Sequence, residues 1–301
     1  MSEANVDCVY VAASAHDARF TRTCVASIRR FYPAVPIRLL AGGPVQRGLL
    51  GELWKYWKVE PAAVTSGDYG WGFVKLEPLF ASPGERFLVL DSDTVLTGPV
   101  IDLWRKDGAP FLVDDEEQTE ADTRSLYYDW DKIRKIDPDA ARPHFVFNSG
   151  QWFGTAGVLT RDDFSPWLEW TMPRRLRYPA FFMPGEQGVL NYVLNRKVAA
   201  AGLAVRREKI MRWPGHSMVG LSADKVADGS AQPLIVHWAG VKKYCFSCMA
   251  GSDILTFFER HYYGRMPMGA LRRLAGLFRS FGSDAMLRLR LRFVQRPIRN
   301  R

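Results

Sequence analysis

Two aspartates separated by one residue, Asp91 and Asp93, are the residues of this 301-residue chain whose types and spacing best suit chemistry. They follow residues 87–90 (FLVL), an apolar run typical of a buried strand. Side chains two apart on an extended segment point the same way, so both carboxylates can face one point. The two carboxylates repel each other unless a cation lies between them, and hard oxygen ligands suit Mg²⁺ or Mn²⁺. The alternative is an ordinary Asp-Ser-Asp turn at the surface.

Polar residues elsewhere in the chain stand where a predicted strand or helix begins or ends. Lys75 lies in a predicted short helix before the aspartate strand, and Asn148 interrupts an apolar run in residues 145–150 (FVFNSG). Glu186 and Gln187 open a predicted helix, and His237 ends residues 233–237 (PLIVH), a predicted buried strand. Each also has a plain structural interpretation: a solvated lysine, a turn, helix N-terminal polar residues, or a hydrogen-bonded histidine.

The elements that must position these residues alternate along the chain. The pattern of apolar residues predicts a buried strand over residues 6–13, an amphipathic helix over 18–32 and a second strand over 37–41. A third β/α step is predicted over residues 51–60. Alternation of this kind indicates a parallel sheet covered by helices, which binds ligands at the carboxyl ends of its strands. Neither GxGxxG nor GxxxxGK[ST] occurs, which argues against the common dinucleotide and P-loop nucleotide sites.

Taken together and in order, these fragments resemble the retaining nucleotide-sugar glycosyltransferases of family 8, the group of glycogenin and of lipopolysaccharide galactosyl- and glucosyltransferases. The resemblance covers about residues 6–245. Its motifs are VYVAAS (9–14), Lys75-Leu76, DSDTVL (91–96), FNSG (147–150), GEQGVLN (185–191) and HWAGVKK (237–243). Glu186 stands where the family usually has aspartate, and Trp238 and Lys242 also depart from its pattern.

The resemblance implies a GT-A fold, an α/β architecture with a mostly parallel central sheet covered by helices and UDP-sugar bound over the first strand. It implies that Asp91, Asp93 and His237 bind a metal ion, Mn²⁺ or else Mg²⁺. It implies that Gln187, Glu186 and Asn148 face the donor sugar and the acceptor. The implied contacts to the nucleotide sugar are Ala12, Ala13, Asp17, Lys75, Ser92, Gly240 and Lys243.

The function implied is metal-dependent transfer of a hexose from UDP-sugar to a saccharide or glycolipid, with retention of configuration, in synthesis of cell-envelope polysaccharide or lipopolysaccharide. The chemistry agrees, because a metal ion and a lysine neutralise the charge that develops on a departing diphosphate. One alternative is a nucleotidyltransferase, which also uses paired carboxylates and a metal ion. Another is a catalytically silent GT-A domain that binds saccharides or acts as a scaffold.

The positive charge of the chain is confined to its C-terminal segment. Residues 265–301 contain ten arginines and one acidic residue, Asp284, so they carry the whole formal net charge of +9. We therefore expect a catalytic domain over 1–264 and a basic amphipathic tail over 265–301. Arginine alternating with leucine and phenylalanine favours an anionic membrane surface. A partner or self-association helix is the alternative, and nucleic acid is not expected because interleaved Tyr, Trp and Lys are lacking.

The remaining composition indicates an ordinary folded protein. A hydrophobic content of 47% argues against a disordered chain. The N-terminus has acidic residues ahead of its apolar run, unlike a secretory signal. Cys8 and Cys24 fall in predicted core elements, where reduced, buried thiols are expected, and Cys245 and Cys248 lack the second CxxC of a zinc site. We expect a cytoplasmic protein, peripheral to the inner face of the membrane.

Overall fold

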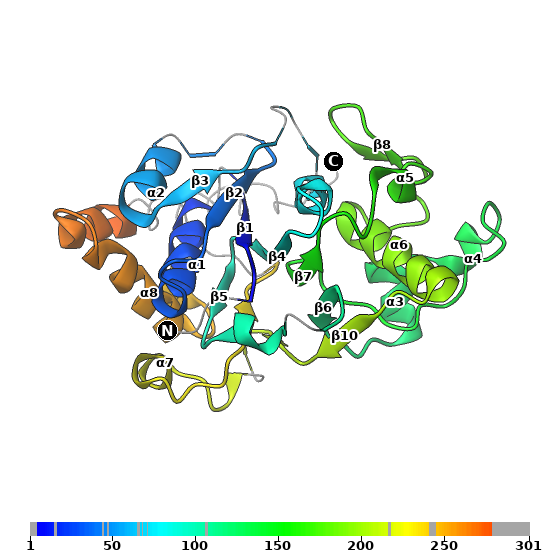
Figure 1. Cartoon of the computed structure of the whole chain (residues 1–301). Helices are drawn as coiled ribbons and strands as arrows, with labels where there is room; N and C mark the ends of the chain where they lie inside the picture. The colour runs from blue at the N-terminus through cyan, green and yellow to red at the C-terminus, as the bar shows by residue number, and fades with distance from the viewer. Residues whose placement is uncertain are drawn as a thin grey trace, which may run out of the picture.

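A computed structural model describes residues 5–14, 17–43, 45–46, 48–64, 67, 69–70, 72–105, 108–215, 218–240 and 245–278. Its centre is a seven-stranded sheet of order β10-β6-β7-β4-β1-β2-β3 (Figure 1). Every neighbouring pair is parallel except the two that β7 makes, with β4 and with β6. The predicted mostly parallel α/β sheet is confirmed. The strands are β1 (Cys8–Ala13), β2 (Ile37–Ala41), β3 (Val59–Pro61), β4 (Arg86–Asp91), β6 (Phe111–Asp114), β7 (Gln151–Thr155) and β10 (Val205–Glu208).

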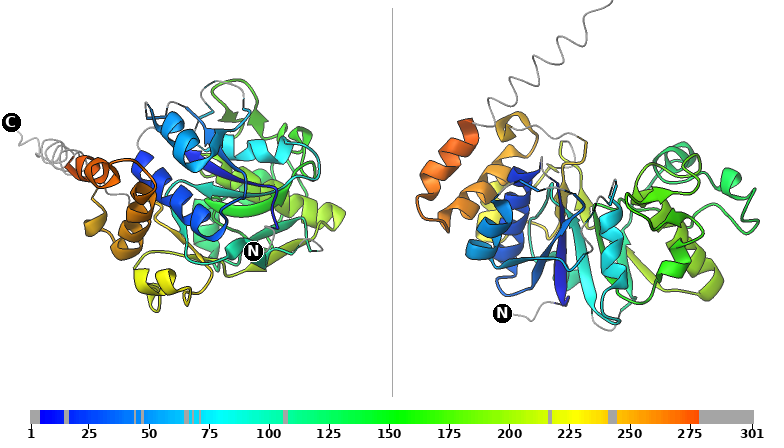
Figure 2. Two further views of the ribbon diagram at one scale, coloured as in Figure 1. Left: turned by 60° about the vertical axis from the view of Figure 1, so that its left-hand side comes forward. Right: turned by 90° about the horizontal axis from the view of Figure 1, so that it is seen from above.

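Helices cover both faces of this sheet, as the separate helix groups in Figures 1 and 2 show. Alternate residues of β1 therefore enter different cores: Val9 and Val11 belong to the core that includes side chains of α1, whereas Cys8 and Tyr10 belong to the core that includes side chains of α6. Burial on both faces explains the continuous apolar runs of the central strands. The helices are α1 (Ala18–Phe31), α2 (Leu49–Trp57), η1 (Phe73–Phe80), η2 (Val100–Leu103), α3 (Glu120–Leu126), α4 (Trp130–Ile133), α5 (Arg161–Phe164), α6 (Glu186–Ala201), α7 (Ala223–Asp228), η4 (Phe246–Cys248) and α8 (Ser252–Gly264).

A second, three-stranded sheet holds the predicted strand that ends in His237. It has the order β11 (Met211–Arg212), β12 (Ile235–His237), β5 (Thr94–Leu96), with β12 antiparallel to β5. The strand is buried as predicted, but it lies outside the central sheet. Because β5 directly follows the aspartates, its pairing with β12 brings His237 back to them. A two-stranded sheet of β8 (Leu168–Glu169) and β9 (Arg175–Leu176) completes the strands.

The described part of the basic tail packs against α8. Residues 269–278 are helical and lie beside α8 in both views of Figure 2. Arg273 pairs with the buried Glu259 at 3.0 Å, and Glu259 also pairs with Arg19 of α1 at 2.6 Å. Cys8 and Cys24 are free thiols and are buried, as expected. Within the described residues, no helix is both long enough and apolar enough to span a bilayer.

Candidate metal centre and ligand pocket

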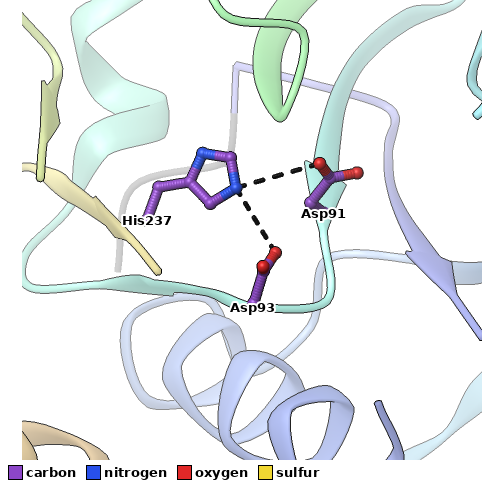
Figure 3. A group of neighbouring side chains, drawn as sticks. All are labelled: Asp91, Asp93 and His237. Carbon is purple, nitrogen blue, oxygen red and sulfur yellow. Dashed lines mark ion pairs between the residues drawn. The ribbon is translucent and has the colours of Figure 1, made fainter. Parts of the chain in front are cut away.

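Asp91, Asp93 and His237 meet at the carboxyl end of β4 (Figure 3). Asp91 is the last residue of β4, Asp93 lies in the turn into β5, and His237 ends β12. One ligand atom from each of the three lies within 4.8 Å of the others. His237 Nε2 is 3.3 Å from Asp93 Oδ1 and 3.8 Å from Asp91 Oδ2. The aspartates are not a surface turn, since Asp93 is only 3% exposed.

The chemistry of this group fits a divalent metal ion. His237 is 1% exposed, yet neither of its ring nitrogens has a hydrogen-bond partner in the described part of the chain. Buried polar groups are nearly always satisfied, so an imidazole left open towards two carboxylates indicates a missing ligand. Two carboxylate oxygens and one imidazole nitrogen form a donor set that a divalent metal ion can use.

Lys75 links the aspartates to the helix that carries Glu186. Its Nζ lies 3.0 Å from Asp91 Oδ1 and 2.6 Å from Glu186 Oε1. It also donates to the main-chain oxygen and the hydroxyl of Ser149, each at 3.3 Å. Ser149 in turn donates to Glu186 at 2.7 Å. Lys75 is 6% exposed, so it is not a solvated surface lysine. Its ammonium group is already occupied by protein partners.

Burial and charge act together on the titration of this network. Burial raises the pKa of Asp91 above its ordinary value; Lys75 opposes this shift, and Asp93 adds to it. Burial alone would lower the pKa of Lys75, but the Asp91 and Glu186 carboxylates raise it above its usual range. Lys75 is therefore a permanent cation in the site, and Asp91 is a carboxylate that would gain from a second positive charge.

Glu186 fits beside Lys75 because residue 72 has no side chain. A Cβ at Gly72 would lie 1.7 Å from Glu186 Oε2, and the φ of Gly72 is +76°, in the left-handed region. Gln187 also contacts Ser149: its Oε1 accepts from the Ser149 N–H at 3.1 Å, and its Nε2 donates to the main-chain oxygen of Leu126 at 2.9 Å. The extra methylene of Glu186, relative to aspartate, is thus directed to Lys75 and towards the space over Gly72.

These side chains line one pocket of about 960 Å³, at the upper end of the range for ligand sites. The structure brings together on its wall every predicted site residue that it describes, whereas Lys243 lies outside the described residues. The predicted residues on the wall are Ala12, Ala13, Asp17, Lys75, Asp91, Ser92, Asp93, Asn148, Glu186, Gln187, His237 and Gly240. Their individual roles remain predictions.

Sequence reasoning assigned no site role to several other residues of the wall. Ser14 donates to Asp17 at 2.7 Å at the entrance to α1, and Gly42, Gly43 and Gly70 form part of the lining. Paired glycines directly after a predicted strand were the available signal, because ligands sit at the carboxyl ends of such strands. For Met183 and Pro184, which precede α6, the sequence carries no comparable signal.

No protein-family model matches the sequence, and no curated protein is significantly similar to it. Solved glycosyltransferase structures do resemble the fold. The bifunctional glycosyltransferase WbbM, in its apo form, is 13% identical over 87% of this chain and 50% of its own, with a TM-score of 0.53. The galactosyltransferase LgtC, solved with donor and acceptor sugar analogues, is 15% identical over 83% of this chain and 94% of its own, with a TM-score of 0.53. This chain has a GT-A-like fold.

The glycosyltransferase GlyE of Streptococcus pneumoniae TIGR4 gives the same result, at 15% identity and a TM-score of 0.52. It covers 92% of this chain but only 64% of its own, so the chain spans half of WbbM and less than two thirds of GlyE. At such identities the likeness concerns the GT-A-like fold alone. Any statement about substrate or reaction must come from the side chains of the pocket.

Proposed function

We propose that this chain is a metal-dependent glycosyltransferase that moves a hexose from a UDP-sugar to a saccharide or glycolipid acceptor with retention of configuration. The observation that carries the proposal is the buried group Asp91, Asp93 and His237 on the wall of a large pocket at the carboxyl ends of β1 and β4. The resemblance of the sequence motifs to family 8 supports the reaction class. The process in which we expect the enzyme to act is synthesis of cell-envelope polysaccharide or lipopolysaccharide.

The role proposed for each residue is the one that the resemblance implies. Asp91, Asp93 and His237 would hold the metal ion, which supplies positive charge to the departing diphosphate. Ala12, Ala13, Asp17 and Ser92 would line the nucleotide, and Gly240 with Lys243 would contact the diphosphate. Gln187, Glu186 and Asn148 would face the donor sugar and the acceptor hydroxyl. In retaining transfer the acceptor attacks from the side that the phosphate leaves, so its proton can pass to a diphosphate oxygen.

Replacing Asp93 with alanine tests the metal role directly. We expect Asp93→Ala to abolish hexose transfer and slow hydrolysis of UDP-glucose or UDP-galactose, and to make UDP binding independent of Mn²⁺, while the thermal unfolding temperature changes little. Asp139→Ala is the matched control, since the Asp139 side chain is 87% exposed. Near-normal, Mn²⁺-dependent turnover by Asp93→Ala would contradict the proposal.

The products separate this proposal from its alternatives. Release of UDP and free or transferred hexose indicates a glycosyltransferase. Cleavage between the two phosphates indicates a nucleotidyltransferase. If the wild-type chain binds UDP-sugar and Mn²⁺ but releases neither product, with or without saccharide acceptors, it is a silent binding domain.

We also propose that residues 265–301 attach the enzyme to an anionic membrane surface on the cytoplasmic side. The described helix 269–278 supports this, because its apolar side chains face outward while Arg273 turns inward to Glu259. The side chains of Met268, Leu271, Leu274 and Phe278 are between 49% and 70% exposed. Apolar side chains inserted beside arginines suit an interface that is both apolar and anionic.

Truncation after Phe278 tests this attachment without breaking the contact between Arg273 and Glu259. It removes seven of the ten arginines. Each arginine near an anionic surface contributes about 1 kcal/mol, so the full chain should sediment with phosphatidylglycerol vesicles at low salt and the truncated chain much less. Phosphatidylcholine vesicles are the control. Equal sedimentation of the two chains would refute a role for residues 279–301 in attachment. No sedimentation of the full chain at low salt would refute membrane attachment through residues 265–301.

A further inference from the structure

The imidazole of His237 is held by packing against two residues that carry no role so far, Trp213 and Gly150. The indole of Trp213 stacks on the imidazole, with ring centroids 5.3 Å apart and an interplanar angle of 22°. The register between two strands brings Trp213 and His237 side by side. Strand β11 pairs in parallel with β12 through Met211 with Ile235 and Arg212 with Val236, so the next residue along, Trp213, stands beside His237.

Gly150 closes off one edge of the same ring. A Cβ at position 150 would lie 2.2 Å from His237 Cε1 and 2.8 Å from Nδ1, so only glycine leaves the ring where it is. The Gly150 main chain is itself fixed: its N–H donates to Asn148 Oδ1 at 2.8 Å, and its carbonyl accepts from the Asp91 N–H at 2.7 Å. With the Cε1–Nδ1 edge against Gly150, Nε2 is the nitrogen that faces Asp93, at 3.3 Å (Figure 3).

Histidines that bind metal ions are usually oriented by a hydrogen bond from their second ring nitrogen. Among the described residues, Nδ1 of His237 has no such partner. The orientation must therefore come from contact with neighbouring atoms, and Trp213 covers the face of the ring. We propose that Trp213 is a positioning residue, whose stacked indole, together with Gly150, aims Nε2 of His237 at the point where Asp91 and Asp93 converge and thereby sets the affinity for the metal ion.

This inference rests on the proposed metal site, and it is tested by titrating the full-length chain with Mn²⁺ in a calorimeter without any nucleotide. Loss of an orienting contact typically costs 10- to 100-fold in metal affinity. We expect a loss of about that size for Trp213→Ala and less than about threefold for Trp213→Phe, which keeps a ring on the imidazole. Excess Mn²⁺ should restore UDP-hexose hydrolysis by Trp213→Ala, because the variant retains all three ligands.

Trp170→Ala is the matched control. Trp170 also packs against an aromatic ring, but that ring is Phe80, at 5.6 Å, and not a proposed metal ligand. Gly150→Ala is a second test should Trp213→Ala fail to fold; we expect it to weaken Mn²⁺ binding by at least tenfold, because the new methyl group displaces the ring. Wild-type affinity in folded Trp213→Ala or Gly150→Ala would overturn the positioning role and leave the metal site standing. Absence of Mn²⁺ and Mg²⁺ binding by the wild-type chain would overturn both.

Discussion

Replacing Lys75 with methionine removes the cation from a network in which buried carboxylates depend on it. Lys75 Nζ lies 2.6 Å from Glu186 Oε1, and the two side chains are 7% and 4% exposed. Methionine keeps most of the volume of lysine, so the change removes charge without opening a large cavity. Loss of one partner of a buried ion pair costs about 3–5 kcal/mol, because the remaining charge is left uncompensated. Since Asp91 retains some contact with solvent, we expect a loss of about 3 kcal/mol in the free energy of unfolding.

The measurement is urea unfolding in the presence of a chelator, so that no metal ion compensates for the missing ammonium group. Lys132→Met is the control: its side chain is 51% exposed and pairs with Asp129 at 3.3 Å, so its loss should cost less than about 1 kcal/mol. The double variant Lys75→Met/Glu186→Gln should be more stable than Lys75→Met alone, because it no longer buries an unpaired carboxylate. Equal losses for the two lysine variants, or no recovery in the double variant, would refute the reasoning.

Two further predictions concern the same wall and a strand beside it. Gly72→Ala should lower the free energy of unfolding by more than about 1–2 kcal/mol, because it adds the cost of a left-handed φ to the displacement of the Glu186 carboxylate by the new Cβ. Gly43→Ala is the control in urea unfolding, since a Cβ at Gly43 meets nothing within 4 Å. Similar losses for the two variants would contradict the contact between residue 72 and Glu186. Burial raises the pKa of Asp114 to about 6. A carboxyl whose pKa is raised on folding binds its proton more tightly in the folded state than in the unfolded state. The free energy of unfolding of the wild type should therefore fall by up to about 3 kcal/mol as the pH rises from 4 to 7, and Asp114→Asn should not show this fall. Parallel pH profiles for the two chains would contradict this.

The sequence predicts the elements that place Asp91 because local and global signals agree there. A continuous apolar run marks a strand buried on both faces, and the aspartates mark its carboxyl end, which in a parallel sheet is where ligands bind. The strand that ends in His237 was also predicted, but its partner was not. Periodicity gives no information on which strands pair, so the separate sheet in which His237 returns to the aspartates could only be seen in the structure.

Contacts between distant residues account for the rest of what the sequence could not predict. Lys75 lies on the pocket wall, but the sequence did not predict that its ammonium group contacts Asp91, Glu186 and Ser149. The departure of Glu186 from the family pattern becomes intelligible only beside Gly72, over a hundred residues earlier, whose missing side chain leaves room for the longer carboxylate. Trp213 shows no sequence signal at all, because its relation to His237 depends on the register between two short strands.

The charges on the pocket wall explain why the metal ion and the nucleotide sugar should depend on each other. Among the described residues of the wall, Asp17, Asp91, Asp93 and Glu186 are acidic, and Lys75 offsets only one of their four negative charges. A diphosphate brings further negative charge, so in a site of low dielectric it would be repelled by the carboxylates that line its own pocket. A divalent ion held by Asp91, Asp93 and His237, as we propose, would offset two of the remaining negative charges where the diphosphate would lie. Lys75 cannot replace that ion, because its ammonium group already contacts the Asp91 and Glu186 carboxylates. In the proposed site Lys75 would hold these two carboxylates in place, and the metal ion would supply the positive charge that a diphosphate needs.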